Sequence, residues 1–578
     1  MLSNSVVAGA LAASYVLVLV LQLNPALPLD PARLAPLASA IGFFYAVHLT
    51  AICYVMLVGT QLLAREPFSP AWVSVSVLAW LAAAASAAGA GLMWANLHTF
   101  ALVLEPQTVE RTTAGAVVLS GASALFTIVA LARRYAGSGR AVLGVSLVVV
   151  AAGSIAGPLA LRGRATLPPL ESHPLGVSLG DAPAVHTSRV TMIAIDAGSL
   201  DVITNAAAEG RLPNFGRILD SGAVMHLATL HPTSAEAVWA AVATGKLPQK
   251  NGVRSSGIYR LVSGGEAVQL LPAFCFATSL VRSGFLLDEP LGSAAVRTRT
   301  LWSILSTQGL PVGVVNWPLT YPAPAVRGYL VSDAYSRLAL TPSGLDDPAM
   351  MYPPERRADA RQVMEDASAD AAPVLPAAID AAIEERRRAP GRADRANERL
   401  AEMLSGSEPP PLATVRYQSL DPIGHYFLRY AMPSAFGDVT DEERGALGSV
   451  LESHYALIDG AIGRAMARLG PDDLLLVVSG YGMEPLSVGQ RVLERVIGDP
   501  ELSGTHDDAP DGFLMAYGAT VAKARSLRRA SVVDVVPTVL YFLGLPIGRD
   551  MDGYARTDIF QPAFMEIRPL TFIPTYDR

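Results

Sequence analysis

Long apolar stretches dominate the first 165 residues of the chain. Five of them follow one another, at 6–23, 37–63, 72–97, 114–132 and 141–161. Each is near or above the roughly 20 residues that a helix needs to cross a bilayer. Charged and helix-breaking residues lie between them, as in the connections between spans. The pattern predicts a five-span α-helical membrane bundle over residues 1–165, because a soluble protein would have to bury all five runs as core helices.

A different pattern begins after a Pro- and Gly-bearing segment at 166–186, which we interpret as an extended linker. Short apolar runs that end in polar residues alternate here with helical patterns. The runs lie at 190–195, 223–229, 312–316, 412–418 and 474–479. This alternation predicts an α/β domain over 187–578, with ligands at the carboxyl ends of its strands. A charged, helical and Pro-rich stretch at about 344–410 predicts an inserted cap.

Composition and charge narrow the class of protein further. The 578 residues are 51% hydrophobic and 16% charged, against about 25% charged in an average soluble domain. This composition excludes a disordered protein and agrees with a lipid bilayer as one partner. The net charge of −7 argues against nucleic acid as a partner. The chain has two cysteines, Cys53 and Cys275, so neither a disulfide framework nor a cysteine-based zinc site is expected.

Arginines in the short connections predict the orientation of the spans. Arg133, Arg134 and Arg140 lie between the fourth and fifth stretches, and Arg65 lies on the same side. Because short basic loops stay in the cytoplasm, the N-terminus is predicted inside and everything after residue 161 outside. Arg162 and Arg164 weakly favour the opposite orientation. The prediction is a multi-pass protein of the cell membrane with an extracytoplasmic C-terminal domain.

An ordered series of short motifs runs through the α/β domain. The series is Asp196-Ala197-Gly198, Gly210-Arg211-Leu212-Pro213-Asn214-Phe215, Pro232-Thr233, Trp239, Thr244-Gly245-Lys246-Leu247-Pro248, Asn316-Trp317-Pro318, Asp421-Pro422-Ile423-Gly424-His425, Gly504-Thr505-His506 and Asp550-Met551-Asp552-Gly553. In this order the motifs resemble the type I phosphodiesterase / nucleotide pyrophosphatase family of the alkaline phosphatase superfamily. The resemblance spans 187–560 and implies an alkaline-phosphatase-like central sheet flanked by helices.

The resemblance also implies a phosphoryl-transfer site with two metal ions, usually zinc. One metal would be held by Asp421, His425 and His506, all of which are present. The other would take Asp196, the oxygen of a Ser or Thr nucleophile, and an Asp-His pair after a late strand. Carboxylates and neutral imidazoles are the ligands that suit zinc.

The nucleophile side of this pattern is altered in several places. The nucleophile position is Ala235, which has no side-chain oxygen, and Gly480-Tyr481 stands where the family has Asp-His. Asn251 stands where the family has the His of a His-Gly pair. Thr233 and Ser234 are weak candidates for a displaced nucleophile. The candidate replacement ligands or bases are Glu236, Tyr481 and His231.

Two functions remain open at this stage. In the first, the chain is a membrane-anchored, extracytoplasmic pseudoenzyme that binds or regulates an envelope phosphoester or a protein partner. In the second, it is an active hydrolase or phosphotransferase that acts on envelope phosphoesters with one metal ion. We expect one zinc per chain, on Asp421, His425 and His506, with Asp196 unable to hold a second alone. If those three residues only form hydrogen bonds, the chain holds no metal.

Overall fold

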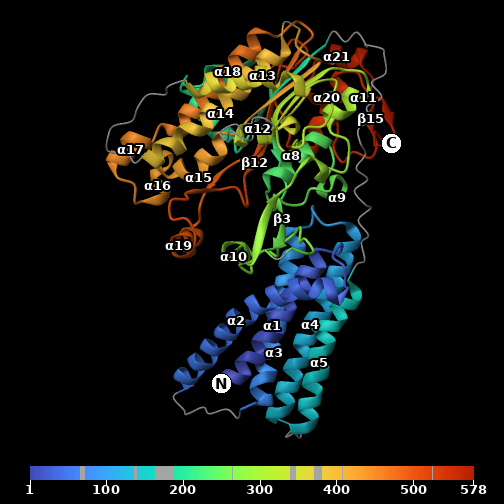
Figure 1. Cartoon of the computed structure of the whole chain (residues 1–578), viewed down its shortest axis with the longest axis vertical. Helices are drawn as coiled ribbons and strands as arrows, with labels where there is room; N and C mark the ends of the chain where they lie inside the picture. Colours follow the sequence, from blue (N-terminus) through green and yellow to red (C-terminus); the bar gives the residue numbers. More distant parts are fainter. Residues whose placement is uncertain are drawn as a thin grey trace. The chain divides into compact units, whose positions relative to one another are not determined.

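The computed structural model describes residues 1–64, 72–135, 140–162, 188–262, 264–338, 347–369, 381–406, 408–523 and 525–577. The predicted linker, Arg65 and parts of the expected cap (344–346, 370–380 and 407) lie outside these ranges. The chain forms two compact units (Figure 1). The helical unit comprises 1–171 and 254–291, and the sheet unit comprises 172–253 and 292–578.

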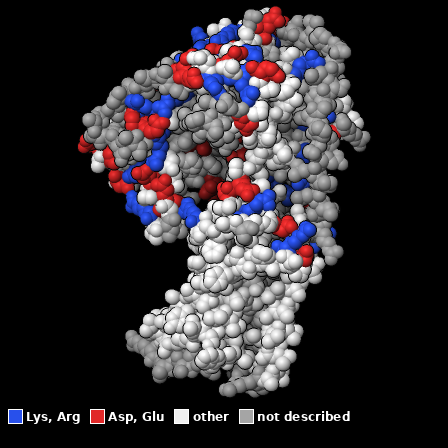
Figure 2. Space-filling model, in the orientation of Figure 1, with Lys and Arg blue, Asp and Glu red and all other residues white. Residues whose placement is uncertain are grey.

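The helical unit contains the five predicted helices. They are α1 (Leu2–Leu23), α2 (Pro31–Ala64), α3 (Val75–Thr99), α4 (Pro106–Tyr135) and α5 (Arg140–Leu161). All five are long and apolar enough to cross a membrane. On the face drawn in Figure 2, uncharged residues cover these helices, whereas charged side chains lie mostly on the sheet unit. The helical unit is therefore compatible with a multi-pass membrane protein.

Buried polar side chains join the helices to one another. Gln22 of α1 donates to the carbonyl of Pro158 in α5 at 2.6 Å, and the Tyr15 and Ser154 hydroxyls lie 2.8 Å apart. Arg162, which follows α5, is 5% exposed and donates to the carbonyl oxygens of Leu21, Asn24 and Leu27. The last carbonyls of a helix have no partner within it, so Arg162 caps the end of α1.

Residues 254–291 interrupt the sheet unit in sequence but pack within the helical unit, and we call them the 254–291 insertion. The insertion consists of the antiparallel strands β3 (Gly257–Leu261) and β4 (Leu286–Pro290), with α10 (Thr278–Arg282) between them. Leu261 and Leu286 share a buried core with Val20 of α1 and Ile41 of α2. This packing is not apparent in the sequence, where the insertion follows the α/β pattern without a break.

The sheet unit is built on a ten-stranded mixed sheet. Its strand order is β13-β2-β12-β9-β1-β8-β5-β6-β7, with β14 also paired to β2. The strands are β1 (Val190–Ile195), β2 (Ala223–Ala228), β5 (Val312–Trp317), β6 (Gly328–Ser332), β7 (Met351–Tyr352), β8 (Leu412–Tyr417), β9 (Leu474–Tyr481), β12 (Asp511–Tyr517), β13 (Arg525–Ser526) and β14 (Ala530–Ser531). The central strands β9, β1, β8, β5 and β6 are parallel. The five predicted apolar runs are all strands of this sheet.

Helices cover both faces of the sheet. One face packs against α6 (Leu200–Ala208), α7 (Pro213–Ser221), α15 (Leu420–Ala431) and α18 (Val450–Ala467). Within the expected cap, α13 (Arg357–Ala369) and α14 (Ala381–Ser405) pack directly on β5 and β6. In Figure 1, α8 (Ala235–Thr244), α11 (Leu301–Thr307) and α20 (Val535–Phe542) lie on the opposite side from α14 and α18.

Shorter elements complete the sheet unit. They are α9 (Pro248–Asn251), α12 (Asp333–Leu338), α16 (Pro433–Phe436), α17 (Asp441–Leu447), α19 (Val488–Ile497), α21 (Pro562–Ile567), β10 (Glu484–Pro485), β11 (Gly504–Thr505), β15 (Ile547–Gly548) and β16 (Phe572–Ile573). Of these, β11 matters for the site, because it precedes His506.

Candidate active site

Three neighbouring parallel strands bring the motif residues together at their carboxyl ends. Asp196 directly follows β1, Arg416 lies near the end of β8, and Gly480-Tyr481 ends β9. The register pairs Ala194 with Arg416. Polar residues at this edge of a parallel sheet are well placed to bind ligands, as the sequence pattern predicts.

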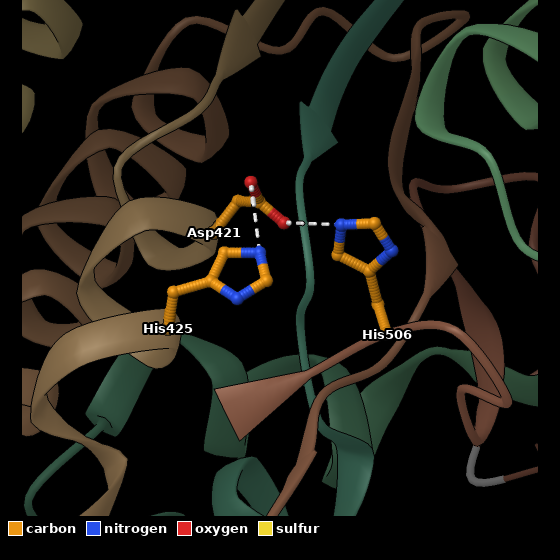
Figure 3. A group of neighbouring side chains, drawn as sticks. All are labelled: Asp421, His425 and His506. Atoms are coloured by element: carbon orange, nitrogen blue, oxygen red, sulfur yellow. Dashed lines mark ion pairs between the residues drawn. The ribbon is translucent and has the colours of Figure 1, made fainter. Parts of the chain in front are cut away.

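Asp421, His425 and His506 form a cluster beside this edge (Figure 3). Asp421 and His425 lie one turn apart on α15, and His506 lies in the segment between β11 and β12. One ligand atom from each of the three residues lies within 4.8 Å of the other two. The Nε2 atoms of His425 and His506 are 3.9 Å and 3.6 Å from the Asp421 carboxylate oxygens. The structure thus assembles the three residues that the family resemblance assigns to one metal.

The donors in this cluster fit a zinc ion. The Nδ1 atom of His425 bonds the carbonyl oxygen of Gly504 at 2.8 Å. This bond fixes the ring and directs Nε2 toward Asp421, as the outer hydrogen bond of a metal-bound histidine does. Asp421 Oδ1 and His506 Nδ1 are buried and have no hydrogen-bond partner among the described residues. Two imidazoles and one carboxylate make a common ligand set for catalytic zinc.

A buried carboxylate on α14 holds the start of α15. Asp394 accepts hydrogen bonds from the backbone N–H groups of Gln418 and Ser419, at 2.9 Å and 3.1 Å. Burial raises the pKa of Asp394 to about 6, although these hydrogen bonds oppose the rise. Because Asp421 and His425 lie just beyond, Asp394 fixes the end of α15 that carries the cluster.

Asp196 has protein partners on both of its carboxylate oxygens. It is 2% exposed. Its Oδ1 accepts hydrogen bonds from Trp239 Nε1 at 2.7 Å and from Arg416 Nε at 2.9 Å. Its Oδ2 is paired with the other arm of the Arg416 guanidinium. Burial raises the pKa of Asp196, and the charge of Arg416 opposes that rise. The two side chains form a bidentate ion pair where the family pattern implies a metal-binding carboxylate.

Arg416 is a residue of the site that the sequence analysis missed. Burial acts to lower its pKa, but the charge and hydrogen bonds of Asp196 outweigh burial and the pKa rises, so the guanidinium stays charged. The signal in the sequence was an arginine inside the apolar run 412–418, which predicts a buried strand. A charge in a buried strand requires a partner of opposite charge. Asp196, which directly follows the adjacent strand β1, is that partner.

The two candidate displaced nucleophiles differ in their contacts. The Thr233 hydroxyl donates to the carbonyl of Leu230 at 2.9 Å and is buried. The Ser234 hydroxyl donates to Glu236 Oε2 at 3.3 Å. Burial raises the pKa of Glu236, and Arg416 lowers it in part. Ala235 is the first residue of α8, and His231, the other proposed base, is exposed.

The remaining altered positions are filled by packing. A Cβ atom at Gly480 would lie 2.5 Å from Val238 Cγ1 of α8, so the Val238 side chain occupies the space that a side chain at 480 would need. Tyr481 is fully buried with its ring centroid 5.2 Å from that of His506. Burial raises its pKa well above the usual value, and its hydroxyl has no partner in the described part of the chain. Asn251 is taken up in a turn, where its side chain bonds the Lys246 carbonyl and the Val253 N–H.

The strand order, the flanking helices and the site at the carboxyl ends of β1, β8 and β9 define an alkaline-phosphatase-like α/β fold. The sequence model of the type I phosphodiesterase / nucleotide pyrophosphatase family matches residues 190–536, which is more than half of the chain. The chain belongs to this family. Its five apolar N-terminal helices lie outside the matched region.

Similar solved structures include murine ectonucleotide pyrophosphatase / phosphodiesterase 5. The match has 11% sequence identity and a TM-score of 0.38, and it covers 64% of this chain and all of that chain. An inactive variant of the same murine protein in complex with AMP matches with the same identity and TM-score over 65% of this chain. No curated protein matches the chain. Because the identity and the TM-score of these structures are low, the family assignment rests on the match to the family model alone.

Proposed function

We propose that this chain is a membrane-anchored pseudoenzyme of the phosphodiesterase family, which binds an envelope phosphoester or a protein partner without hydrolysing it. The observation that carries the proposal is the buried ion pair between Asp196 and Arg416. It supports a degenerate site in which a guanidinium takes the place of the nucleophile-side metal. Ala235 at the nucleophile position and the packing of Val238 against Gly480 agree with this interpretation.

The chemistry of the remaining residues supports binding more than turnover. When bound by Asp421, His425 and His506, zinc would supply a Lewis acid with an open coordination position. Arg416 neutralises the Asp196 charge, but a guanidinium accepts no ligand lone pair and cannot activate a hydroxyl as a metal does. Burial raises the pKa of Tyr481, which favours its hydroxyl as a hydrogen-bond donor.

The test is a hydrolysis assay on the purified full-length chain with zinc present. We expect no release of nitrophenol from a nitrophenyl phosphodiester or phosphomonoester above the level of the His425→Ala variant. Zinc-dependent hydrolysis by the natural chain that His425→Ala abolishes would overturn the proposal. The partner class is then probed by binding of a non-hydrolysable phosphoester to the zinc-loaded chain.

A second candidate function rests on the contact between Ser234 and Glu236. A serine hydroxyl that donates to a buried carboxylate of raised pKa has a nearby proton acceptor, as an activated nucleophile requires. The chain would then be an active one-metal phosphoester hydrolase or phosphotransferase. Its signature would be a phosphorylated Ser234 after incubation with substrate. Ser234→Ala should abolish turnover, while Thr233→Ala, the matched neighbouring control, should leave it largely intact.

We further propose that the sheet unit is extracytoplasmic. Arg133, Arg134 and Arg140 support a cytoplasmic loop between α4 and α5. Arg162, which opposed this orientation in the sequence, is buried as the cap of α1, so it does not act as an exposed charge of the opposite loop. A reporter enzyme that works only outside the cytoplasm should be active when it is fused after Arg578. Activity of a cytoplasm-specific reporter at that position would refute the orientation.

A further inference from the structure

Two buried asparagines of the helical unit hold the 254–291 insertion by its backbone. Asn24 Oδ1 accepts from the N–H groups of Gln269 and Leu270, both at 2.9 Å, and its Nδ2 donates to the Leu270 carbonyl at 2.8 Å. Asn96 Oδ1 accepts from Ala273 N–H at 2.8 Å, and its Nδ2 donates to the Ala273 carbonyl at 3.2 Å. Each amide thus pairs with both the N–H and the C=O of one peptide segment, as a neighbouring strand would.

These contacts place the insertion at one end of the helical bundle. Asn24 is the residue after α1, and Asn96 lies in the last turn of α3. At the same end, Arg254 of the insertion pairs with Glu105, between α3 and α4, at 2.5 Å. If the five helices span a bilayer, their ends lie near its surfaces. Residues 269–276 therefore lie at the level of a membrane–water interface.

Two phenylalanines of the insertion are turned away from the helices. Phe274 is 73% exposed and Phe276 is 64% exposed. Their backbone φ angles are +63° and +54°, in the left-handed region that bulky residues rarely adopt. The segment is held there because Ala273 is bonded to Asn96, and because the carbonyl of Cys275 accepts from the Tyr45 hydroxyl at 3.1 Å. The strained backbone thus presents two aromatic rings outward on either side of Cys275.

Contacts join the insertion to α2, which has exposed apolar side chains of its own. Phe44 of α2 packs on Phe285 of the insertion, with ring centroids 5.4 Å apart, and Tyr45 contacts Cys275. Phe43 and Val47, which lie close to Phe44 and Tyr45 in the sequence of α2, are 65% and 50% exposed. In a spanning helix, such residues face lipid. Phe274 and Phe276 flank Cys275, which contacts Tyr45, so both lie next to α2.

We propose that Phe274 and Phe276 insert into the lipid leaflet on this side, at the boundary between head groups and acyl chains. Phenylalanine is among the apolar residues that interfacial segments bury at this depth. The 254–291 insertion then attaches the phosphodiesterase-family domain to the bilayer surface, in addition to its hold on the helices. The inference rests on the membrane placement of the five helices and is independent of whether the active site turns over substrate.

Photocrosslinking tests this inference in the full-length chain. Benzoylphenylalanine replaces Phe274 or Phe276 in chains reconstituted into nanodiscs of radiolabelled phosphatidylethanolamine and phosphatidylglycerol. We expect several-fold more labelled lipid on these chains than on a chain with the same substitution at Tyr554. Tyr554 is a matched control because it is an aromatic residue of the sheet unit that is 79% exposed. Substitution of Phe43 on α2 is the positive control for lipid contact.

The outcomes separate the inference from the membrane placement on which it rests. Lipid adducts at Phe43 but not at Phe274 or Phe276 would overturn the inference and leave the spans in place. Adducts from Phe274 or Phe276 to a second copy of the chain, or to another membrane protein in native membranes, would identify a protein contact and also overturn it. Absence of adducts at Phe43 as well would contradict the membrane placement itself.

Discussion

Asp196 lies directly after the central strand β1, and its carboxylate is satisfied by Arg416 and Trp239. A metal ion can be removed by a chelator, whereas a guanidinium on β8 is a permanent part of the fold. The pair also carries no net charge, while Asp196 with a zinc ion would be positive. The Asp196–Arg416 pair should thus attract a phosphoryl group less strongly than Asp196 with a bound metal ion would.

Removing the charge of Arg416 should destabilise the sheet unit. Arg416→Met leaves the Asp196 carboxylate buried beside Trp239 without a counter-charge, and breaking a buried ion pair in this way costs about 3–5 kcal/mol. The double variant Asp196→Asn/Arg416→Met should recover most of that loss, since no unpaired charge remains. Chemical unfolding followed by tryptophan fluorescence measures both. Equal stability of Arg416→Met and the natural chain would show that the pair is unimportant.

Metal content should respond to the cluster and not to Asp196. We expect one zinc per chain, which His506→Ala removes, because the loss of one of three ligands leaves too weak a site. Asp196→Ala should barely change the zinc content, since its oxygens are already bound by protein groups. Elemental analysis of the purified chain after dialysis measures this. Two zinc ions per chain would show that another side chain had rebuilt the second site, and none would make the cluster structural.

The residues of the candidate site were predictable to different degrees. Asp421 and His425 stand four apart, a spacing that puts both on one helix face, and the family pattern adds His506. Arg416 could not be found in this way, because its role depends on which strand lies beside β1. The sequence alone did not supply the strand order that brings β8 next to β1.

At the scale of elements, helix α8 and strand β9 together fill the position where the family pattern has an Asp-His pair. Gly480 allows Val238 of α8 to approach the strand, so the loss of the family's Asp-His pair and the packing of α8 are linked. A carboxylate could be restored at 480 only if the Val238 side chain moved or became smaller. This contact accounts for the absence of a side chain at 480.

A substitution at Gly480 tests this packing. Gly480→Ala should destabilise the sheet unit by about 1–3 kcal/mol, the usual cost of overpacking a core. Val238→Ala/Gly480→Ala should be more stable than the sum of the two single changes predicts, because the smaller residue makes room for the new methyl group. Thermal unfolding of the three variants provides the comparison. Strict additivity would mean that the two positions do not touch.

The contact between α14 and α18 should weaken in acid. Burial lowers the pKa of His454 on α18 to about 4, and its Nε2 bonds the Arg387 carbonyl of α14. The unfolded state therefore binds a proton more readily than the folded state, and stability falls as the pH drops from about 6.5 toward 4. At pH 5 the loss is about 2 kcal/mol. Hydrogen exchange of α14 amides at pH 7 and pH 5 measures it.

His454→Gln is the control for this prediction, because glutamine keeps a polar side chain that does not titrate. In that variant the difference in α14 protection between the two pH values should largely disappear. Persistence of the same difference would assign the acid sensitivity to another group.

Most elements could be predicted, but one packing relationship could not. Strand β1 begins and ends where the apolar run 190–195 does, since a buried strand needs such a run and a polar residue ends it. The five long helices are equally clear from their apolar length. The 254–291 insertion was missed because its partners, Asn24 and Asn96, lie far away in sequence and satisfy backbone groups rather than a recognisable side-chain pattern.

At the scale of the whole molecule, the chain passes between its two units three times, after residues 171, 253 and 291. The segment 166–186, predicted to be a linker, is therefore one of three covalent connections. The other two lead into a segment held by Asn24, Asn96 and the Arg254–Glu105 pair. We expect that the covalent connection at 166–186 alone, or the hydrogen-bonded 254–291 insertion alone, is enough to keep the sheet unit at the membrane.

This arrangement has a consequence for shedding, the release of a soluble ectodomain by a protease. After cleavage at a protease site engineered within 166–186, the fragment that carries the sheet unit should still sediment with membranes through a high-salt wash. Asn24→Ala/Asn96→Ala should increase its release, because the insertion loses five hydrogen bonds to the helices. Complete release of the cleaved natural chain would contradict the second attachment. If the proposed location is right, we expect that a single cut within 166–186 does not release this domain from the cell.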